Sequence, residues 1–355
     1  MLIDEFSSFE NKYLFEKKYD DFSYWVYSRY AIFSYLTKLQ EGIEMSSQKM
    51  TDGLICGIKN MIINSLRYRH KIKKIGHRDL LILNHERRVL KDGYYRCIYT
   101  EQIEEHYPNS VVLERPYFYK HLKPIQTERI FYSDCVELES LIYGFLECKL
   151  KAKKYRKAKK FFEKEMSIVA PEFQHMVKQE VSVEALSEML TRLYLLYCVK
   201  RKKFEKVIQK IQPKVILEVV SYNLDCMIFN EIAYEKKINT IELQHGVMSG
   251  SIAYYYPKNV LIKQFPQKVF LFSDYWKNCI SVPLEDKNVI SVGYPYFEEQ
   301  VKKYQKINRD KNKTTKVILF LSQWTIGENF SKFAVEFSNL INDKWKIIYK
   351  LHPGE

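Results

Sequence analysis

Short apolar runs alternate with segments of helical periodicity in the second half of the chain. Residues 214–220 (KVILEVV) and 238–243 (INTIEL) have the composition of buried strands, and residues 224–236 between them favour a helix. Strand, helix and strand within about thirty residues form a βαβ unit, whose two strands pair in parallel. Strand-like runs recur at residues 268–273 (KVFLFS) and 288–293 (NVISVG). This region is therefore predicted to form a parallel sheet.

The first third of the chain has a similar mixture of helix and strand patterns. Residues 20–39 and 51–70 carry apolar side chains at helical spacing, which predicts two amphipathic helices. Residues 135–210 consist almost entirely of helix-forming residues. We interpret this stretch as a helical insertion between two α/β halves of one Rossmann-type domain. Short buried strands are predicted at residues 79–84, 111–114 and 129–132.

A change of pattern near residue 305 predicts a boundary between an N-terminal domain at residues 1–305 and a C-terminal domain at residues 306–355. The charged segment 298–315 favours a helix followed by a linker, and residues 316–322 (KVILFLS) then begin another βαβ unit. Its helix is predicted at residues 328–342 and its second strand at residues 346–351. One βαβ unit of about fifty residues cannot cover both faces of its own sheet. We therefore expect the rest of this domain to come from a longer protein or from a partner.

The composition is basic, and the cysteines are widely spaced along the chain. Among 355 residues, 57 Lys and Arg stand against 43 Asp and Glu, a formal net charge of +14, which favours polyanionic partners. No helix-turn-helix, zinc-finger or RNP-type motif is found, so nucleic acid is not an expected partner. The seven cysteines include no CxxC pair, which fits a reduced, cytoplasmic protein better than a disulfide framework or a zinc site. The sequence contains no run of about 18 apolar residues, so no membrane span is expected.

The strongest basic cluster lies in the helical stretch, between residues 151 and 160 (KAKKYRKAKK). Two interpretations remain open. The cluster can be the solvated face of a helix, or it can dock on an anionic membrane surface, where each nearby cation contributes ~1 kcal/mol. In the second case the membrane-facing residues are Lys151, Lys153, Lys154, Arg156 and Lys157.

Candidate chemistry follows the predicted strands. In parallel α/β sheets, ligands bind beyond the carboxyl ends of the strands. Gln244, His245 and Gly246 come directly after the strand at residues 238–243, and His352 follows the last predicted strand. The unperturbed pKa of a histidine lies near neutral pH, so His245 is suited to proton transfer. The alternatives are a turn-capping histidine at position 245 and a strand exit before proline at position 352.

A weaker candidate set follows the strand at residues 79–84. His85, Glu86 and Arg88 could line an acceptor site, and a solvated turn is the alternative. Asp92 and Gly93 favour a plain turn. The sequence lacks the GxxxxGK[ST], GxGxxG, HExxH and GxSxG patterns. Kinase, dehydrogenase, zincin and α/β-hydrolase functions are therefore not expected.

The order of these motifs resembles a known group of enzymes. A βα array ending in LQHG, a VGYP segment, a linker, the run ILFLSQ and a strand ending in KLHPGE resemble the GT-B glycosyltransferases of bacterial surface-polysaccharide synthesis. The most similar branch includes capsule polysaccharide enzymes, CDP-glycerol glycerophosphotransferases, and bacterial sialyl- and polysialyltransferases. The resemblance covers residues 214–355, and residues 80–101 match the family's N-terminal half more weakly. Each motif has two or three residues, so their order and spacing carry the resemblance.

The resemblance implies a metal-independent glycosyltransferase with a GT-B fold, no cofactor, and a nucleotide-activated donor, CMP- or CDP-linked in the most similar branch. Its acceptor would be a growing capsule or lipopolysaccharide glycan, often lipid-linked, at the inner face of the plasma membrane. His352 would contact the donor phosphate, with Gln244 and Gly246 as further contacts. His245 would be the general base, or a second phosphate contact. The family's Ser/Thr-rich phosphate turn and acidic ribose contact would lie beyond Glu355.

A non-catalytic module is the competing hypothesis. In that case the N-terminal domain docks on anionic lipid or on a partner enzyme through its basic helices.

Overall fold

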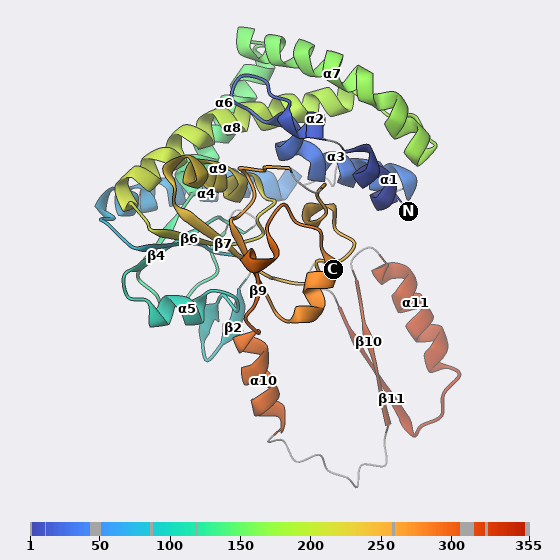
Figure 1. Cartoon of the computed structure of the whole chain (residues 1–355). Coiled ribbons are helices and arrows are strands. Elements are labelled where there is room, and N and C mark those ends of the chain that lie inside the picture. Colours follow the sequence, from blue (N-terminus) through green and yellow to red (C-terminus); the bar gives the residue numbers. More distant parts are fainter. Residues whose placement is uncertain are drawn as a thin grey trace. The chain divides into compact units, whose positions relative to one another are not determined.

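The computed structural model describes residues 2–10, 12–42, 51–85, 88–117, 120–257, 260–305, 316–323 and 326–351, with the backbone alone at residues 12, 51–56 and 69–73. The chain divides into two compact units, residues 1–296 and residues 297–355. Each unit carries its own parallel sheet (Figure 1). The predicted α/β fold class is therefore confirmed.

The first unit is built on a sheet of seven parallel strands in the order β5-β4-β1-β6-β7-β8-β9. At the centre of the sheet, Leu80 on β1 pairs with Val215 on β6, and Val215 pairs with Asn239 on β7. The strands predicted for this region are all present, with ends shifted by a few residues at most. Their bounds are β1 Leu80–Leu83, β4 Ser110–Glu114, β5 Ile130–Tyr132, β6 Val215–Val219, β7 Asn239–Leu243, β8 Lys268–Leu271 and β9 Val289–Ser291.

The strand order is that of a doubly wound sheet. From β1 the chain adds β4 and β5 on one side, and then crosses back to add β6, β7, β8 and β9 on the other side. The order reverses between β1 and β6. In open parallel sheets, ligands bind at the carboxyl ends of the strands beside such a switch point. The topology therefore predicts a ligand site at the loops that follow β1, β6 and β7.

Both faces of this sheet are buried. Leu81 and Ile216 point into the larger core cluster, and Ile82 and Leu217 point into a smaller cluster on the opposite face. Helices α1, α3, α7, α8 and α9 supply the larger cluster, whereas Tyr68 of α4 packs in the smaller one. A parallel strand that is covered on both faces has a nearly continuous apolar sequence, as β6 does.

The predicted helices at residues 20–39 and 51–70 correspond to α3 and α4. The helical stretch at 135–210 forms α6, α7 and α8, which together make the crossover from β5 to β6. Within the described residues, no helix is both long enough and apolar enough to cross a bilayer. The helices are α1 Leu2–Phe9, α2 Lys12–Glu16, α3 Tyr24–Gln40, α4 Thr51–Lys74, α5 Glu101–His106, α6 Asp134–Lys149, α7 Lys153–Val177, α8 Val183–Ile211, α9 Leu224–Lys236 and α10 Pro295–Gln305.

A small antiparallel hairpin, β2 (Val89–Lys91) and β3 (Tyr94–Arg96), interrupts the parallel pattern. Its two-residue turn is Asp92-Gly93, and both residues have positive φ, 52° and 80°. This is the conformation that an Asp-Gly pair favours in a tight hairpin. The predicted turn is therefore confirmed, but the two strands beside it were not predicted.

The second unit contains the predicted βαβ motif. Strands β10 (Lys316–Leu321) and β11 (Trp345–Lys350) pair in parallel, and α11 (Gly327–Ser338) connects them. Phe320 of β10 packs against Phe330 and Phe337 of α11. The helix ends at Ser338, before the predicted end at residue 342, because residues 339 and 340 form a turn.

Candidate functional site

Loops from three neighbouring strands meet at the switch point of the first unit. His85 follows β1, Tyr222 follows β6 and His245 follows β7. The ring centroid of His245 lies 6.2 Å from that of His85 and 6.1 Å from that of Tyr222. The structure thus brings together His245 and His85, two residues that sequence reasoning had assigned to different parts of a site.

His245 has an unusual electrostatic environment. Its ring nitrogen Nδ1 is buried and has no hydrogen-bond partner among the described residues. The hydroxyl of Tyr99 donates a hydrogen bond of 2.7 Å to the His245 carbonyl, which fixes the backbone of the turn. Burial, and after it the charge of His85, lowers the pKa of His245 to about 4. The imidazole is therefore neutral at physiological pH, with a lone pair on one of its two ring nitrogens.

Gln244 holds the turn in place. Its amide Nε2 donates to the Gly246 carbonyl at 2.8 Å, and its Oε1 accepts from the backbone N–H of Phe272 at 2.8 Å. The residue is only 1% exposed. Because both ends of the amide are used within the protein, the structure gives Gln244 a positioning role in place of the expected phosphate contact.

Gly246 lies where a side chain would meet open space. A Cβ at this position would have no heavy atom within 4 Å. Among the described residues, nothing therefore fills the space beside the Gly246 backbone, and the predicted contact at Gly246 stays a prediction.

The residues after β1 differ in their availability. His85 is half-buried beside Tyr99, with ring centroids 5.8 Å apart. Arg88, in contrast, is buried, and its guanidinium pairs with Glu114 at 2.7 Å and with Glu101 at 3.2 Å. Arg88 therefore stabilises the fold and is not exposed to an acceptor, which corrects the expectation for this residue.

Aromatic rings surround His245 and were missed by sequence reasoning. Tyr99 stacks on Tyr294 at 5.9 Å, and Tyr294 stacks on Phe272 at 4.3 Å. On the other side, Tyr222 lies 4.6 Å from Tyr30 of α3. The high tyrosine content was the available signal, but it could not indicate which of 28 tyrosines would gather here. Such rings form apolar platforms with polar edges, which suit the faces of sugars and bases.

The loop after β6 carries backbone strain. Val220 has a φ of 66°, in the left-handed region that β-branched residues rarely adopt. The chain then enters α9, whose N-cap Asn223 accepts a hydrogen bond of 3.0 Å from the Cys226 N–H. Strain of this kind persists where the surrounding structure enforces it, often at functional sites.

An arginine lies at the same edge of the sheet. Arg115 directly follows β4, its side chain is 35% exposed, and its Nε lies 4.0 Å from Asp225 in the first turn of α9. Asp225 also pairs with the buried Lys200 at 2.7 Å. Arg115 thus pairs with a carboxylate beside the N-terminal end of α9, an end whose N–H groups favour an anion. Sequence reasoning missed Arg115 because nothing local distinguishes it.

Two buried carboxyl groups lie on β6 and β7, close to their carboxyl ends. Glu218 and Glu242 are paired residues of the two strands, and both are 0% exposed. Each has one oxygen with a partner: Asn230 donates to Glu218 at 2.8 Å, and Tyr254 donates to Glu242 at 2.8 Å. Burial, and after it the charge of Glu242, raises the pKa of Glu218 to about 8. The pair is therefore not doubly ionised at neutral pH.

The remaining predicted residues fall into two groups. Glu86 and His352 lie outside the described residues. In the basic cluster, Lys151, Lys153, Arg156 and Lys157 are exposed. Lys154 instead lies over the ring of Tyr194, 5.1 Å from its centroid, and does not point away from the protein.

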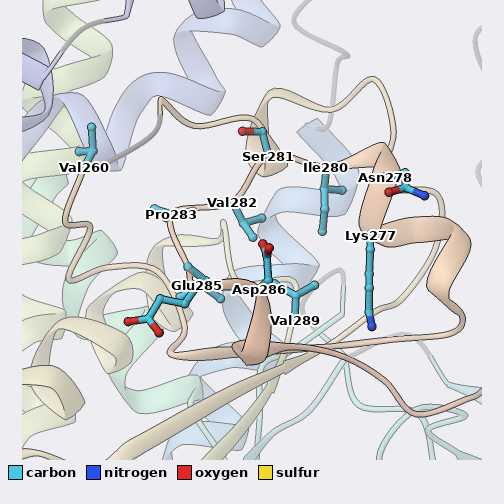
Figure 2. Close-up of a pocket in the computed structure, with 11 residues that line it drawn as sticks. Val260, Lys277, Asn278, Ile280, Ser281, Val282, Pro283, Glu285, Asp286 and Val289 are labelled. Atoms are coloured by element: carbon cyan, nitrogen blue, oxygen red, sulfur yellow. The ribbon is translucent and has the colours of Figure 1, made fainter.

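No group of three or more His, Cys, Asp or Glu side chains in the described part of the chain could hold a metal ion. A cavity of about 780 Å³ lies apart from the switch point, between Val260 and the segment from Lys277 to Val289. Figure 2 shows Lys277, Glu285 and Asp286 among its lining residues. None of the predicted site residues that the structure describes lines this cavity.

Comparisons with known proteins give a structural similarity and no match to a family model or a curated protein. Among solved structures, the chain is similar to a UDP-N-acetylglucosamine 2-epimerase from Rickettsia bellii, with a TM-score of 0.34 and 10% sequence identity. The match covers 79% of this chain and 63% of that protein, so the chain spans less than two thirds of its length.

Proposed function

We propose that the chain belongs to a metal-independent GT-B glycosyltransferase that moves a sugar or sugar-like group from a nucleotide donor to a growing capsule or lipopolysaccharide glycan. The observation that carries this proposal is His245. A neutral imidazole with an unpartnered, buried ring nitrogen lies at the carboxyl edge of a doubly wound sheet, beside the switch point. A general base for an acceptor hydroxyl needs a neutral group with a lone pair at the reacting oxygen.

The proposed reaction is a single displacement at the sugar. The acceptor oxygen forms a bond to the anomeric carbon, and the bond from that carbon to the donor phosphate breaks. The phosphate leaves with the electron pair, while the imidazole of His245 takes the proton of the acceptor hydroxyl. Charge builds on the leaving phosphate, so nearby cations and helix N–H groups stabilise the transition state. We assign this role to Arg115 and the start of α9, and His352 is the further donor contact that the family resemblance implies.

The aromatic rings fit the acceptor side of this proposal. Tyr99 and Tyr222 flank His245, with ring centroids 6.5 Å and 6.1 Å from that of its imidazole. Sugar rings have apolar C–H faces that pack on such surfaces, while their hydroxyls reach polar neighbours. His85 is the additional polar side chain at this position.

Nucleotide titration is the first test. Purified protein would be titrated by calorimetry with CMP, CDP, UDP and GDP, and we expect one cytidine nucleotide to bind. His352→Ala should weaken that binding, whereas His245→Ala should leave it intact. If none of the four nucleotides binds, the transferase proposal fails.

The second test separates the base from the donor contacts. With the nucleotide class known, transfer from the corresponding donor should fall about 10²- to 10⁴-fold in His245→Ala. His77→Ala is the matched control, because His77 is an exposed histidine away from the sheet edge. Equal rates in the two variants would exclude His245 as the base.

A further inference from the structure

Helix α6 presents an apolar face to solvent. Its outward positions recur at spacings of three and four residues, which places them on one side of the helix. Phe145 is 62% exposed, and Leu150, directly after the helix, is 73% exposed. The exposed apolar residues here are Leu141, Ile142, Phe145, Leu146 and Leu150.

Helix α4 continues this face. The two helices pack against each other, and Ile62 and Leu66 of α4 share a hollow of about 540 Å³ with Val136 and Leu138 of α6. The exposed apolar residues of α4 are Ile58, Ile62, Ile63 and Leu66. These nine residues of α4, α6 and position 150 are called the α4/α6 apolar face below. Ile62 and Leu66 adjoin the start of α6, and apolar surface on two packed helices marks a docking site more often than singly scattered residues do.

Basic residues border the α4/α6 apolar face. Lys149 ends α6, and the exposed Lys151, Lys153, Arg156 and Lys157 continue from the same end. Lys203, Lys206 and Lys210 of α8 line the hollow between the two helices. Glu139 is an exposed carboxylate on the outward side of α6, and Lys203 forms an ion pair with it. The border of the face is therefore positively charged.

We infer that the α4/α6 apolar face docks on the surface of an anionic phospholipid bilayer. An interfacial membrane surface needs apolar side chains that enter the boundary of the acyl chains and cations that meet the headgroups. Both are present in one place here. A protein partner would require acidic groups to match the same border, whereas an anionic bilayer supplies them everywhere.

Vesicle co-sedimentation tests this inference. Purified protein would be mixed with vesicles of phosphatidylcholine alone, or of phosphatidylcholine with phosphatidylglycerol. We expect binding to the anionic vesicles and little binding to the neutral ones. Phe145→Ser should weaken binding about ten-fold, because serine lacks the apolar ring area that phenylalanine transfers from water into the bilayer. Lys149→Gln should weaken it about five-fold, and added salt should reduce the effect of this second variant.

Ile168→Ser is the matched control, because Ile168 is 59% exposed on α7 and lies outside the α4/α6 apolar face. It should bind vesicles like the wild type. Analytical ultracentrifugation would show whether the face instead binds a second copy of the chain. The inference is overturned if anionic vesicles do not bind, if Phe145→Ser and Ile168→Ser behave alike, or if Phe145→Ser abolishes a dimer. Because the test measures no nucleotide or transfer, it fails or succeeds independently of the proposed function.

Discussion

Strands β6 and β10 lie in segments that begin alike, but their surroundings are opposite. The segment KVILEVV of the first unit and KVILFLS of the second begin with the same four residues. In β6, Leu217 is 4% exposed, whereas Leu319, at the matching position in β10, is 54% exposed. A strand's apolar sequence therefore does not by itself show how deeply the strand is buried.

The difference comes from what covers each sheet. In the first unit, neighbouring strands flank β6 on both sides and core clusters bury both of its faces. In the second unit, β10 has one neighbouring strand, and Phe320 packs toward α11. Val317, Leu319 and Leu321 alternate with Phe320 along the strand and are more than half exposed. Burial of a parallel strand is thus a property of the whole domain around it.

The largest predicted effect sets these two leucines against each other. Leu217→Ala should lower the free energy of unfolding by about 2–5 kcal/mol, because it removes buried methyl groups and leaves a cavity. Leu319→Ala should change it by no more than about 0.5 kcal/mol, because the side chain is already in water. Urea-induced unfolding of the two variants, followed by circular dichroism, measures both values. Similar losses in the two variants would show that β10 is buried in solution.

Sequence patterns predicted the elements well because strand and helix periodicity are local properties. The βαβ unit around α9 and the turn that carries His245 are examples, since each depends on residues within about thirty positions. The hairpin β2–β3 was missed because Val89–Lys91 and Tyr94–Arg96 are too short to show a pattern. The outward direction of α6 could not be predicted either, because an apolar stripe has the same spacing whether it faces a core or solvent.

The candidate site was predictable only in part for the same reason. The position of His245 after a strand follows from the sequence, and its lowered pKa follows from burial by residues far along the chain. Tyr99 reaches His245 across 146 positions. Arg88 was misjudged because its partners, Glu101 and Glu114, come from later elements that fold back over it.

A second prediction concerns the first position at which the matched strands differ, Glu218 in β6 and Phe320 in β10. The raised pKa of Glu218 means that the folded protein holds a proton that the unfolded chain releases above pH 4.5. The stability that protonated Glu218 contributes is therefore fully present below pH 4.5 and is lost as the pH rises through about 8. Glu218→Gln keeps an acceptor for Asn230 and removes the charge.

We expect this variant to gain stability relative to the wild type by roughly 2–4 kcal/mol between pH 4.5 and pH 9. Urea unfolding at a series of pH values measures the change. Glu298→Gln is the control, since Glu298 is exposed on α10 and should leave the pH dependence as it is. A wild-type protein whose stability is constant over this range would contradict the shared burial of Glu218 and Glu242.

A third prediction concerns His245, at the carboxyl edge of the buried sheet. As the pH falls below 6.5, the His245 side chain of the unfolded chain becomes protonated. In the folded protein, whose His245 pKa is lowered, protonation occurs only near pH 4. Stability is fully present above pH 6.5 and is lost as the pH falls toward 4. His245→Asn should reduce this loss by about 1–2 kcal/mol, because asparagine does not titrate. The same loss in His245→Asn and in the wild type would assign the acid sensitivity to other groups.

The smallest predicted effect compares helix caps in the two units. The Ser182 hydroxyl accepts a hydrogen bond of 3.1 Å from the Ala185 N–H at the start of α8, whereas Ile326 at the start of α11 provides no side-chain cap. Ser182→Ala should therefore cost about 1 kcal/mol. Ile326→Ser adds an acceptor where none exists and should stabilise α11 by up to about 1 kcal/mol. Amide hydrogen exchange separates the two helices. If Ile326→Ser leaves exchange in α11 unchanged, the backbone at Ile326, with φ −118° and ψ 0°, does not adopt the capping conformation when serine is present.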